Sequence, residues 1–123
     1  MKIFTLFLMI FLHIIDDYKL KGILASMKQK KYWKENAPDI LYEHDYIMAL
    51  ATHAFSWTFM IMLPIAWALS FNLTVSFIVI FIINWVIHAV VDDLKCNKFK
   101  INLVEDQLIH LCQIIATFLW FSC

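Results

Sequence analysis

The sequence predicts an all-α fold, an integral membrane four-helix bundle of up-down-up-down topology that forms one domain over residues 1–123. Of these residues, 63% are hydrophobic and 16% are charged, whereas soluble domains carry about 25% charged residues. Apolar runs of roughly membrane-spanning length recur along the chain, and nine of the ten lysines fall in the first and third connections between them. The net charge is zero. This composition excludes a basic nucleic-acid groove and predicts the lipid bilayer as the surrounding medium.

The first helix is expected over residues 2–24. Its apolar part, from Ile3 to Ile15, is short for a bilayer, which needs about 20 residues. Its C-terminal half must therefore be shielded by neighbouring helices. Residues 25–45 follow as a loop or interfacial helix, basic and aromatic in composition, and its lysines, Lys28 among them, are predicted to lie against lipid headgroups.

The other three helices are expected over residues 46–70, 73–94 and 103–123. Only Phe71 and Asn72 separate the second helix from the third, so these two helices should form an antiparallel hairpin. Four spans place both termini on one side of the membrane. The positive-inside rule then puts the two lysine-rich connections, between helices one and two and between helices three and four, in the cytoplasm.

Histidine and aspartate residues recur at a spacing of four on three of these helices, and residues four apart lie on one face of a helix. Each ionisable side chain at membrane depth costs roughly 2 to 3 kcal/mol, so such side chains usually face the bundle interior and meet a partner. In the expected topology the three pairs and one lone histidine lie at a similar depth, in the cytoplasmic third of the membrane. The candidate metal ligands are therefore His13, Asp17, His53, His88, Asp92, Asp106 and His110.

Imidazole and carboxylate groups suit zinc foremost, with manganese or iron as alternatives, and seven ligands could hold one or two ions. Two other interpretations stay open: a metal-free hydrogen-bond or proton network, and polar residues that are unrelated to one another. Asp16 and Asp93 are offset by one position from the histidine face and are expected to be solvated boundary residues. Ser56 and Asn84 lie near that face, either supporting the ligands or packing beside them.

These motifs also carry a resemblance. The chain resembles a family of small bacterial and phage inner-membrane proteins, classed as a domain of unknown function, in four features that keep their order: His13-x-x-x-Asp17-Tyr18, His53, His88-x-x-x-Asp92-x-x-Lys95 and Asp106-Gln107-x-x-His110. The resemblance covers nearly the whole chain and implies a multi-pass protein of the bacterial inner membrane, or of the host inner membrane if the protein is phage-encoded. Members often carry glutamine where this chain has Lys21, so no role of that amide is transferred. A more distant resemblance is to membrane-bound metal-dependent hydrolases.

The leading functional hypothesis is a metal-dependent hydrolase that acts at the cytoplasmic membrane face on a phosphoester or lipid-linked substrate. Asp17, Asp92 and Asp106 are candidates for a general base or a bridging ligand. Lys21 and Lys95, one turn beyond two of the motifs, could bind an anionic headgroup or could simply anchor the protein at the membrane surface.

Two alternatives belong to other classes. One is a metal-ion or proton transport protein, which predicts polar residues that continue toward the outer side of the membrane. The other is a non-enzymatic membrane protein that binds a partner, either a second copy of the chain or another membrane protein. Its His/Asp site would then serve only to stabilise the fold.

Overall fold

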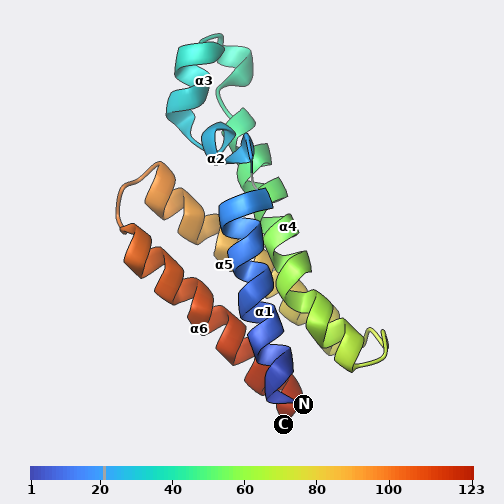
Figure 1. Ribbon diagram of the computed structural model, residues 1–123. Helices are drawn as coiled ribbons and strands as arrows, with labels where there is room; N and C mark the ends of the chain where they lie inside the picture. Colours follow the sequence, from blue (N-terminus) through green and yellow to red (C-terminus); the bar gives the residue numbers. More distant parts are fainter. Residues whose placement is uncertain (21) are drawn as a thin grey trace.

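The computed structural model describes residues 1–20 and 22–123, and the chain is helical without strands over these residues. Four long segments form the body of the molecule: α1 (Ile3–Ile15), which continues into the π-helical turn η1 (Asp16–Leu20), α4 (Asp45–Ala68), α5 (Val75–Cys96) and α6 (Leu103–Ser122). They run in alternating directions, and both termini lie at the same end (Figure 1). The all-α prediction is confirmed.

The bounds of α4, α5 and α6 lie within two residues of the predicted ones. Side-chain caps mark the starts of α5 and α6, whereas α4 begins without one. Thr74 caps α5 by accepting a hydrogen bond from the Phe77 amide. A capping box begins α6, in which the Asn102 side chain accepts from the Glu105 amide and the Glu105 side chain accepts from the Asn102 amide. The first helix differs from the prediction, because its α-helical part ends at Ile15 and a π-helical turn follows.

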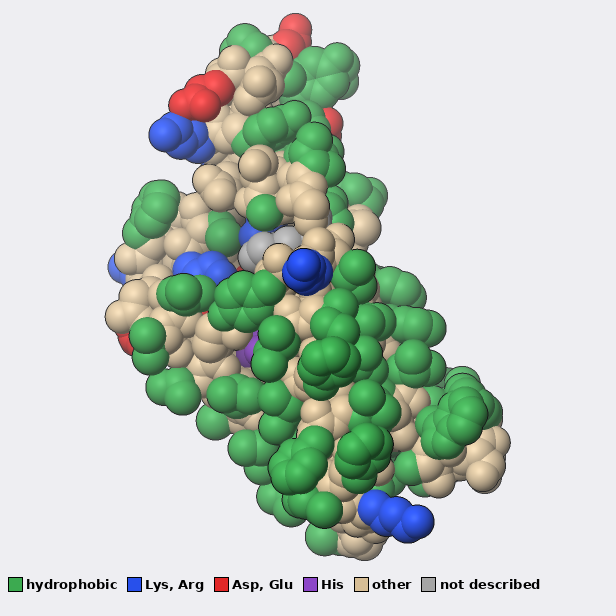
Figure 2. Space-filling model, in the orientation of Figure 1, with side chains coloured by type: hydrophobic (Ala, Val, Ile, Leu, Met, Phe, Trp, Pro, Cys, Tyr) green, Lys and Arg blue, Asp and Glu red, His purple; other side chains and the backbone are tan. Residues whose placement is uncertain are grey.

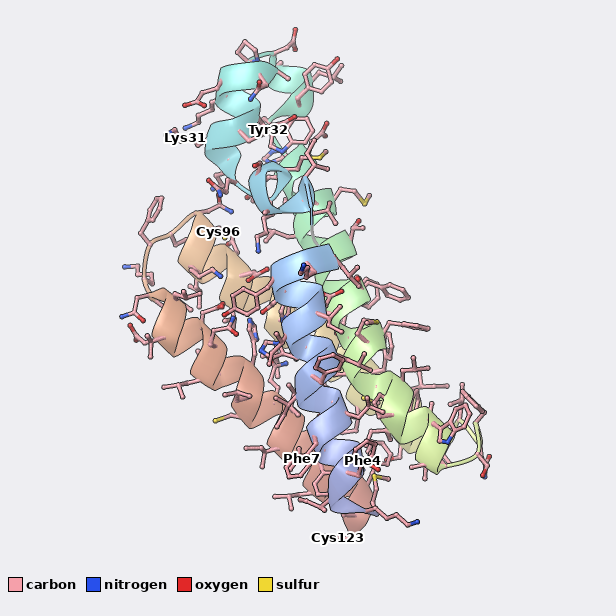
Figure 3. The ribbon with its side chains drawn as sticks, viewed as in Figure 1. Phe4, Phe7, Lys31, Tyr32, Cys96 and Cys123 are labelled. Atoms are coloured by element: carbon pink, nitrogen blue, oxygen red, sulfur yellow. The ribbon has the colours of Figure 1, made fainter. Side chains whose placement is uncertain are left out.

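Three short helices form a cap at the end of the bundle opposite the termini: α2 (Leu24–Met27), α3 (Lys30–Asn36) and the 3₁₀-helix η2 (Ile40–Tyr42). Figure 3 labels Lys31 and Tyr32 on this cap, and Phe4, Phe7 and Cys123 at the far end. The segment that was expected to be a loop or interfacial helix is therefore mostly helical. It folds back over the end of the bundle.

Asn97, the residue after α5, attaches the cap to the bundle. Its side-chain Nδ2 donates to the Lys28 carbonyl oxygen at 3.0 Å, and its Oδ1 accepts from the Lys30 amide at 2.7 Å. Within the cap, the Trp33 indole donates to the Met27 carbonyl at 2.6 Å. These bonds fix the position of residues 27–30 relative to the C-terminal end of α5.

Within the described ranges, two segments are long and apolar enough to cross a membrane, Ile40–Ala68 and Val75–Cys96. The α-helical part of α1 has only 13 residues, and α6 carries Glu105 and Asp106 in its first turn. Length and composition therefore support two of the four predicted spans, and the spans predicted at α1 and α6 are not supported by this criterion. Figure 2 shows that hydrophobic side chains cover most of the visible bundle surface below the cap.

The apolar core occupies the half of the bundle nearer the termini. Its fully buried members come from three helices and include Met9, Ile61, Ile65 and Ile114. Trp57 of α4 belongs to the same cluster and has no exposed surface. Its indole contacts the histidine rings described below, so Trp57 separates the apolar half of the interior from a polar half.

Candidate metal centre

The polar half of the interior lies between the apolar core and the cap. Figure 3 shows nitrogen and oxygen atoms gathered there among α1, α5 and α6. All seven predicted ligands are buried at this place, with exposed fractions of 5% or less: His13, Asp17, His53, His88, Asp92, Asp106 and His110. The topological inference that the recurrent motifs meet at one depth therefore agrees with their positions in the structure.

Six of these seven residues form groups that could hold a metal ion. In each group, one ligand atom from each of three side chains lies within 4.8 Å of the others. The groups share members, so they constitute one continuous set, which we call the His/Asp cluster. The three groups are Asp17 with His53 and His88, His88 with Asp92 and His110, and Asp17 with Asp106 and His110.

Distances between neighbouring ligand atoms in the His/Asp cluster match those around a metal ion. Nitrogen and oxygen ligands bind zinc at about 2.0 to 2.2 Å, which places two tetrahedral ligands about 3.4 Å apart. His53 Nε2 lies 3.3 Å from Asp17 Oδ1 and 3.4 Å from Asp92 Oδ2. His88 Nε2 lies 3.6 Å from the same Asp92 oxygen. The donor atoms therefore already stand at the separation that a small divalent ion requires.

Several ligand atoms of the cluster are buried and make no hydrogen bond to any part of the chain that the structure describes. They are both ring nitrogens of His53, both ring nitrogens of His88, His110 Nε2 and Asp106 Oδ1. A buried polar atom without a partner costs about 1 to 3 kcal/mol, and buried polar groups are rarely left in this state. Coordination of a cation would satisfy these atoms.

At the His110–Asp106 pair, the neighbouring hydrogen bonds show which ring nitrogen of His110 carries the proton. The Gln113 amide nitrogen donates to the carbonyl and side-chain oxygens of Asn84 at 3.2 and 3.1 Å. Gln113 Oε1 therefore faces His110 Nδ1 at 3.0 Å as an acceptor, which assigns the proton to Nδ1. In neutral His110, Nε2 then presents a lone pair to Asp106 Oδ1 at 3.2 Å. Two acceptors so placed repel each other unless a proton or a metal cation lies between them.

Because Gln113 orients the imidazole of His110, its replacement should weaken metal binding without removing a ligand. We expect Gln113→Leu to lower metal affinity about 10- to 100-fold, the usual effect of losing such a supporting bond. Competition with a chromophoric chelator measures this affinity, and Gln29→Leu in the cap is the matched control. Equal affinities in the two variants would show that Gln113 does not orient His110.

His13 differs from the other predicted ligands, because both of its ring nitrogens have partners. Trp57 Nε1 donates to His13 Nδ1 at 2.7 Å, and His13 Nε2 lies 3.0 Å from Gln107 Oε1. The Gln107 amide nitrogen then donates to carboxylate oxygens of Asp17 and Asp106 at 3.1 and 3.0 Å. In this arrangement His13 positions two carboxylates through Gln107, and it belongs to none of the three groups.

Asp16 corrects an expectation, because it is fully buried rather than solvated. Asp16 and Asp17 begin the π-helical turn η1, and both are buried. They lie three and four residues after His13, and both spacings keep a side chain near the face of His13 on a helix. Asp16 Oδ1 accepts from Ser56 Oγ at 2.6 Å, and Asp16 Oδ2 lies 3.7 Å from His53 Nδ1. Asp16, bonded to Ser56, thus lies on the Nδ1 side of the His53 ring. Asp93, by contrast, lies at the edge of the site, where it contacts Lys98.

Lys28 is a second correction. It was expected at the lipid headgroups, but only 2% of it is exposed. The cap carries its Nζ to 2.7 Å from Asp92 Oδ2, while Lys95 Nζ lies 3.1 Å from Asp106 Oδ2 and 3.9 Å from Asp92 Oδ1. The sequence gives no local signal for Lys28, because its burial follows from the fold of the cap. The predicted site residue Lys21 lies outside the described residues.

Trp57 was also missed, although its spacing could have identified it. It lies four residues after His53 and therefore on the same face of α4. Its ring stacks on His88 with centroids 4.3 Å apart and an interplanar angle of 20°. His88 in turn stacks on His110 at 4.1 Å. Trp57 thus packs against the cluster on the side of the apolar core and holds the histidine rings in place.

Comparison of the chain with protein-family models, with curated proteins and with solved structures found no match. The family resemblance carried by the sequence motifs therefore stays a prediction, and function has to be inferred from the site itself.

Proposed function

We propose that this protein is a metal-dependent hydrolase embedded in a bacterial inner membrane, acting at the cytoplasmic face on a phosphoester or lipid-linked substrate. One observation supports this proposal above the others. Imidazole nitrogens and a carboxylate oxygen without hydrogen-bond partners in the described part of the chain converge inside a helical bundle. Imidazole and carboxylate ligands inside a helical bundle favour a divalent metal, with zinc as the first choice and manganese or iron as alternatives.

Insertion of all four long helices into the bilayer is part of the proposal. Large apolar side chains are exposed along α1 and α6 as well as on the two longer apolar segments, for example Phe7 at 58%, Phe11 at 57% and Leu119 at 54%. An apolar surface of this extent is unfavourable in water. A short α1 can be accommodated where the cap and neighbouring helices cover its polar end. The lysine-rich connections then lie in the cytoplasm by the positive-inside rule.

A bound ion would polarise the phosphoryl group and activate a water molecule for attack. With an ion held by His88, Asp92 and His110, Asp106 is the best-placed base, because its Oδ2 accepts from Lys95 and Gln107 while its Oδ1 makes no hydrogen bond to the described residues. The water oxygen forms a bond to phosphorus as the ester bond between phosphorus and the leaving oxygen breaks. Asp106 takes the proton from the water and returns it to the leaving oxygen.

The proposal is tested by turnover of the metal-loaded protein on phosphomonoesters, phosphodiesters and lipid-linked phosphates. We expect Asp106→Asn to lower turnover about 100-fold or more, the usual range for loss of a general base. His44→Ala, which alters a histidine outside the cluster, is the control and should keep full turnover. Equal background rates for wild type and Asp106→Asn on every substrate would refute hydrolysis.

Transport is the second candidate, and one observation favours it. A buried polar relay leaves the cluster, running from His110 through Gln113 and Asn84 to Thr117. It ends among apolar residues such as Ile114 and Phe118, which close that half of the interior. Metal or proton flux in proteoliposomes that is lost in His110→Ala would establish transport in place of hydrolysis.

A further inference from the structure

We propose that Lys28 and Lys95 form an anion-binding site over the His/Asp cluster, and that this site binds a phosphate group, either a lipid headgroup or a free phosphate. The inference rests on the proposed function, because it assigns the group that binds the substrate of the same centre. Lys28 comes from the cap, and Lys95 comes from the C-terminal end of α5.

The two lysines share one carboxylate. Lys28 Nζ contacts Asp92 Oδ2 at 2.7 Å, and Lys95 Nζ lies 3.9 Å from Asp92 Oδ1. The Asp92 carboxylate therefore lies between two ammonium groups, as an anionic ligand would. His53 and His88 approach the same Oδ2 atom at 3.4 and 3.6 Å. Lys28 and the two imidazoles thus meet at one oxygen of Asp92, whereas Lys95 lies near the other oxygen.

Charge favours an anion in a site that is loaded with two divalent ions. The site contains four buried carboxylates among the described residues, Asp16, Asp17, Asp92 and Asp106, of which Asp92 and Asp106 contact the two lysines. Without metal, the four carboxylates and two lysines leave two negative charges. One divalent cation neutralises this set, and two leave it with two positive charges. Ions that coordinate Asp92 and Asp106 also weaken the hold of these carboxylates on the lysines, whose N–H groups then become available to phosphate oxygens.

The direction of access agrees with a phosphate ligand. Both lysines lie on the side of the cluster that faces the cap, and Figure 2 shows Lys side chains grouped where the cap meets the bundle. In the proposed orientation this level is the cytoplasmic headgroup region. A phosphate that entered there would meet the lysines before it met the imidazoles. An ammonium group as buried as that of Lys28 also discriminates strongly against a neutral ligand, because its charge is little screened by water.

The test uses the full-length protein in detergent, loaded with zinc and titrated with inorganic phosphate by calorimetry, with metal content measured on the same samples. We expect Lys28→Met and Lys95→Met each to weaken phosphate binding about 10-fold or more, the effect of losing a charge-assisted hydrogen bond. Metal content should stay unchanged. Lys31→Met, which removes an exposed lysine from the same cap, should bind phosphate as the wild type does.

Short-chain phosphatidic acid and short-chain phosphatidylcholine distinguish the two sources of phosphate. Tighter binding of phosphatidic acid than of inorganic phosphate would identify a lipid headgroup, and equal binding would identify phosphate itself. Zinc-loaded protein that binds neither, or that binds them equally well in both lysine variants, would overturn the anion site while leaving the metal centre intact. A wild type that takes up no metal would instead refute the proposed function together with this site. If Lys28→Met fails to fold, Lys95→Met decides the matter, since its side chain is partly exposed.

Discussion

Replacing His88 by alanine is expected to reduce metal from near-stoichiometric content to background. His88 belongs to two of the three ligand groups, and both of its ring nitrogens make no hydrogen bond to the described residues. Its removal therefore takes one ligand from the group that contains His53 and one from the group that contains Asp92. Elemental analysis of detergent-purified wild type and His88→Ala, after incubation with zinc, manganese or iron, measures the effect.

A matched control makes this result interpretable. His44→Ala removes a histidine from an exposed position just before α4 and should leave metal content unchanged. Asp92→Ala, which removes another ligand of the cluster, should lose metal as His88→Ala does. Circular dichroism and size-exclusion chromatography establish that each variant is folded. Wild-type protein that retains no metal under any of these conditions would exclude the metal centre and favour a His/Asp hydrogen-bond network.

The helices and the cluster could be predicted from the sequence because both depend on local periodicity. Apolar runs and capping residues such as Thr74 and Asn102 determine where α5 and α6 begin. The spacing of four between His88 and Asp92 fixes a common helix face whatever the tertiary structure. In a bundle of alternating direction, distance along the chain then translates into depth, which is why motifs from separate helices could be assigned to one site.

Residues whose role depends on long-range packing could not be predicted in this way. Asp16 lies three residues after His13, so its place near the histidine face was open to prediction, but its hydrogen bond with Ser56, 40 positions away, was not. Lys28 reaches Asp92, 64 positions away in the sequence, because Asn97 holds the cap against α5. His13 has the same spacing from its aspartate as His88 has. Only its contact with Trp57, 44 positions away, distinguishes a positioning role from ligation.

Trp57 should make the largest single contribution to folding, because it joins the apolar core to the cluster. Its side chain is fully buried, donates to His13 and stacks on His88. We expect Trp57→Ala to lower the free energy of unfolding by about 3 to 5 kcal/mol, the usual cost of truncating a buried aromatic residue. It should also reduce metal content, since His88 and His110 lose the ring that supports them. Denaturant titration in detergent micelles measures the first effect, and elemental analysis measures the second.

Two further variants separate packing from hydrogen bonding at this position. Trp57→Phe keeps an aromatic ring under His88 but leaves His13 Nδ1 without its donor, so its cost should be about 1 to 3 kcal/mol. Trp67→Ala truncates a tryptophan that is 74% exposed near the end of the same helix, and the free energy of unfolding should change by about 0.5 kcal/mol or less. If Trp57→Ala were no more destabilising than Trp67→Ala, the bundle would not depend on Trp57. The inference that Trp57 fixes the imidazoles of His88 and His110 would then be wrong, because a ring that contributes nothing to folding cannot hold them in place.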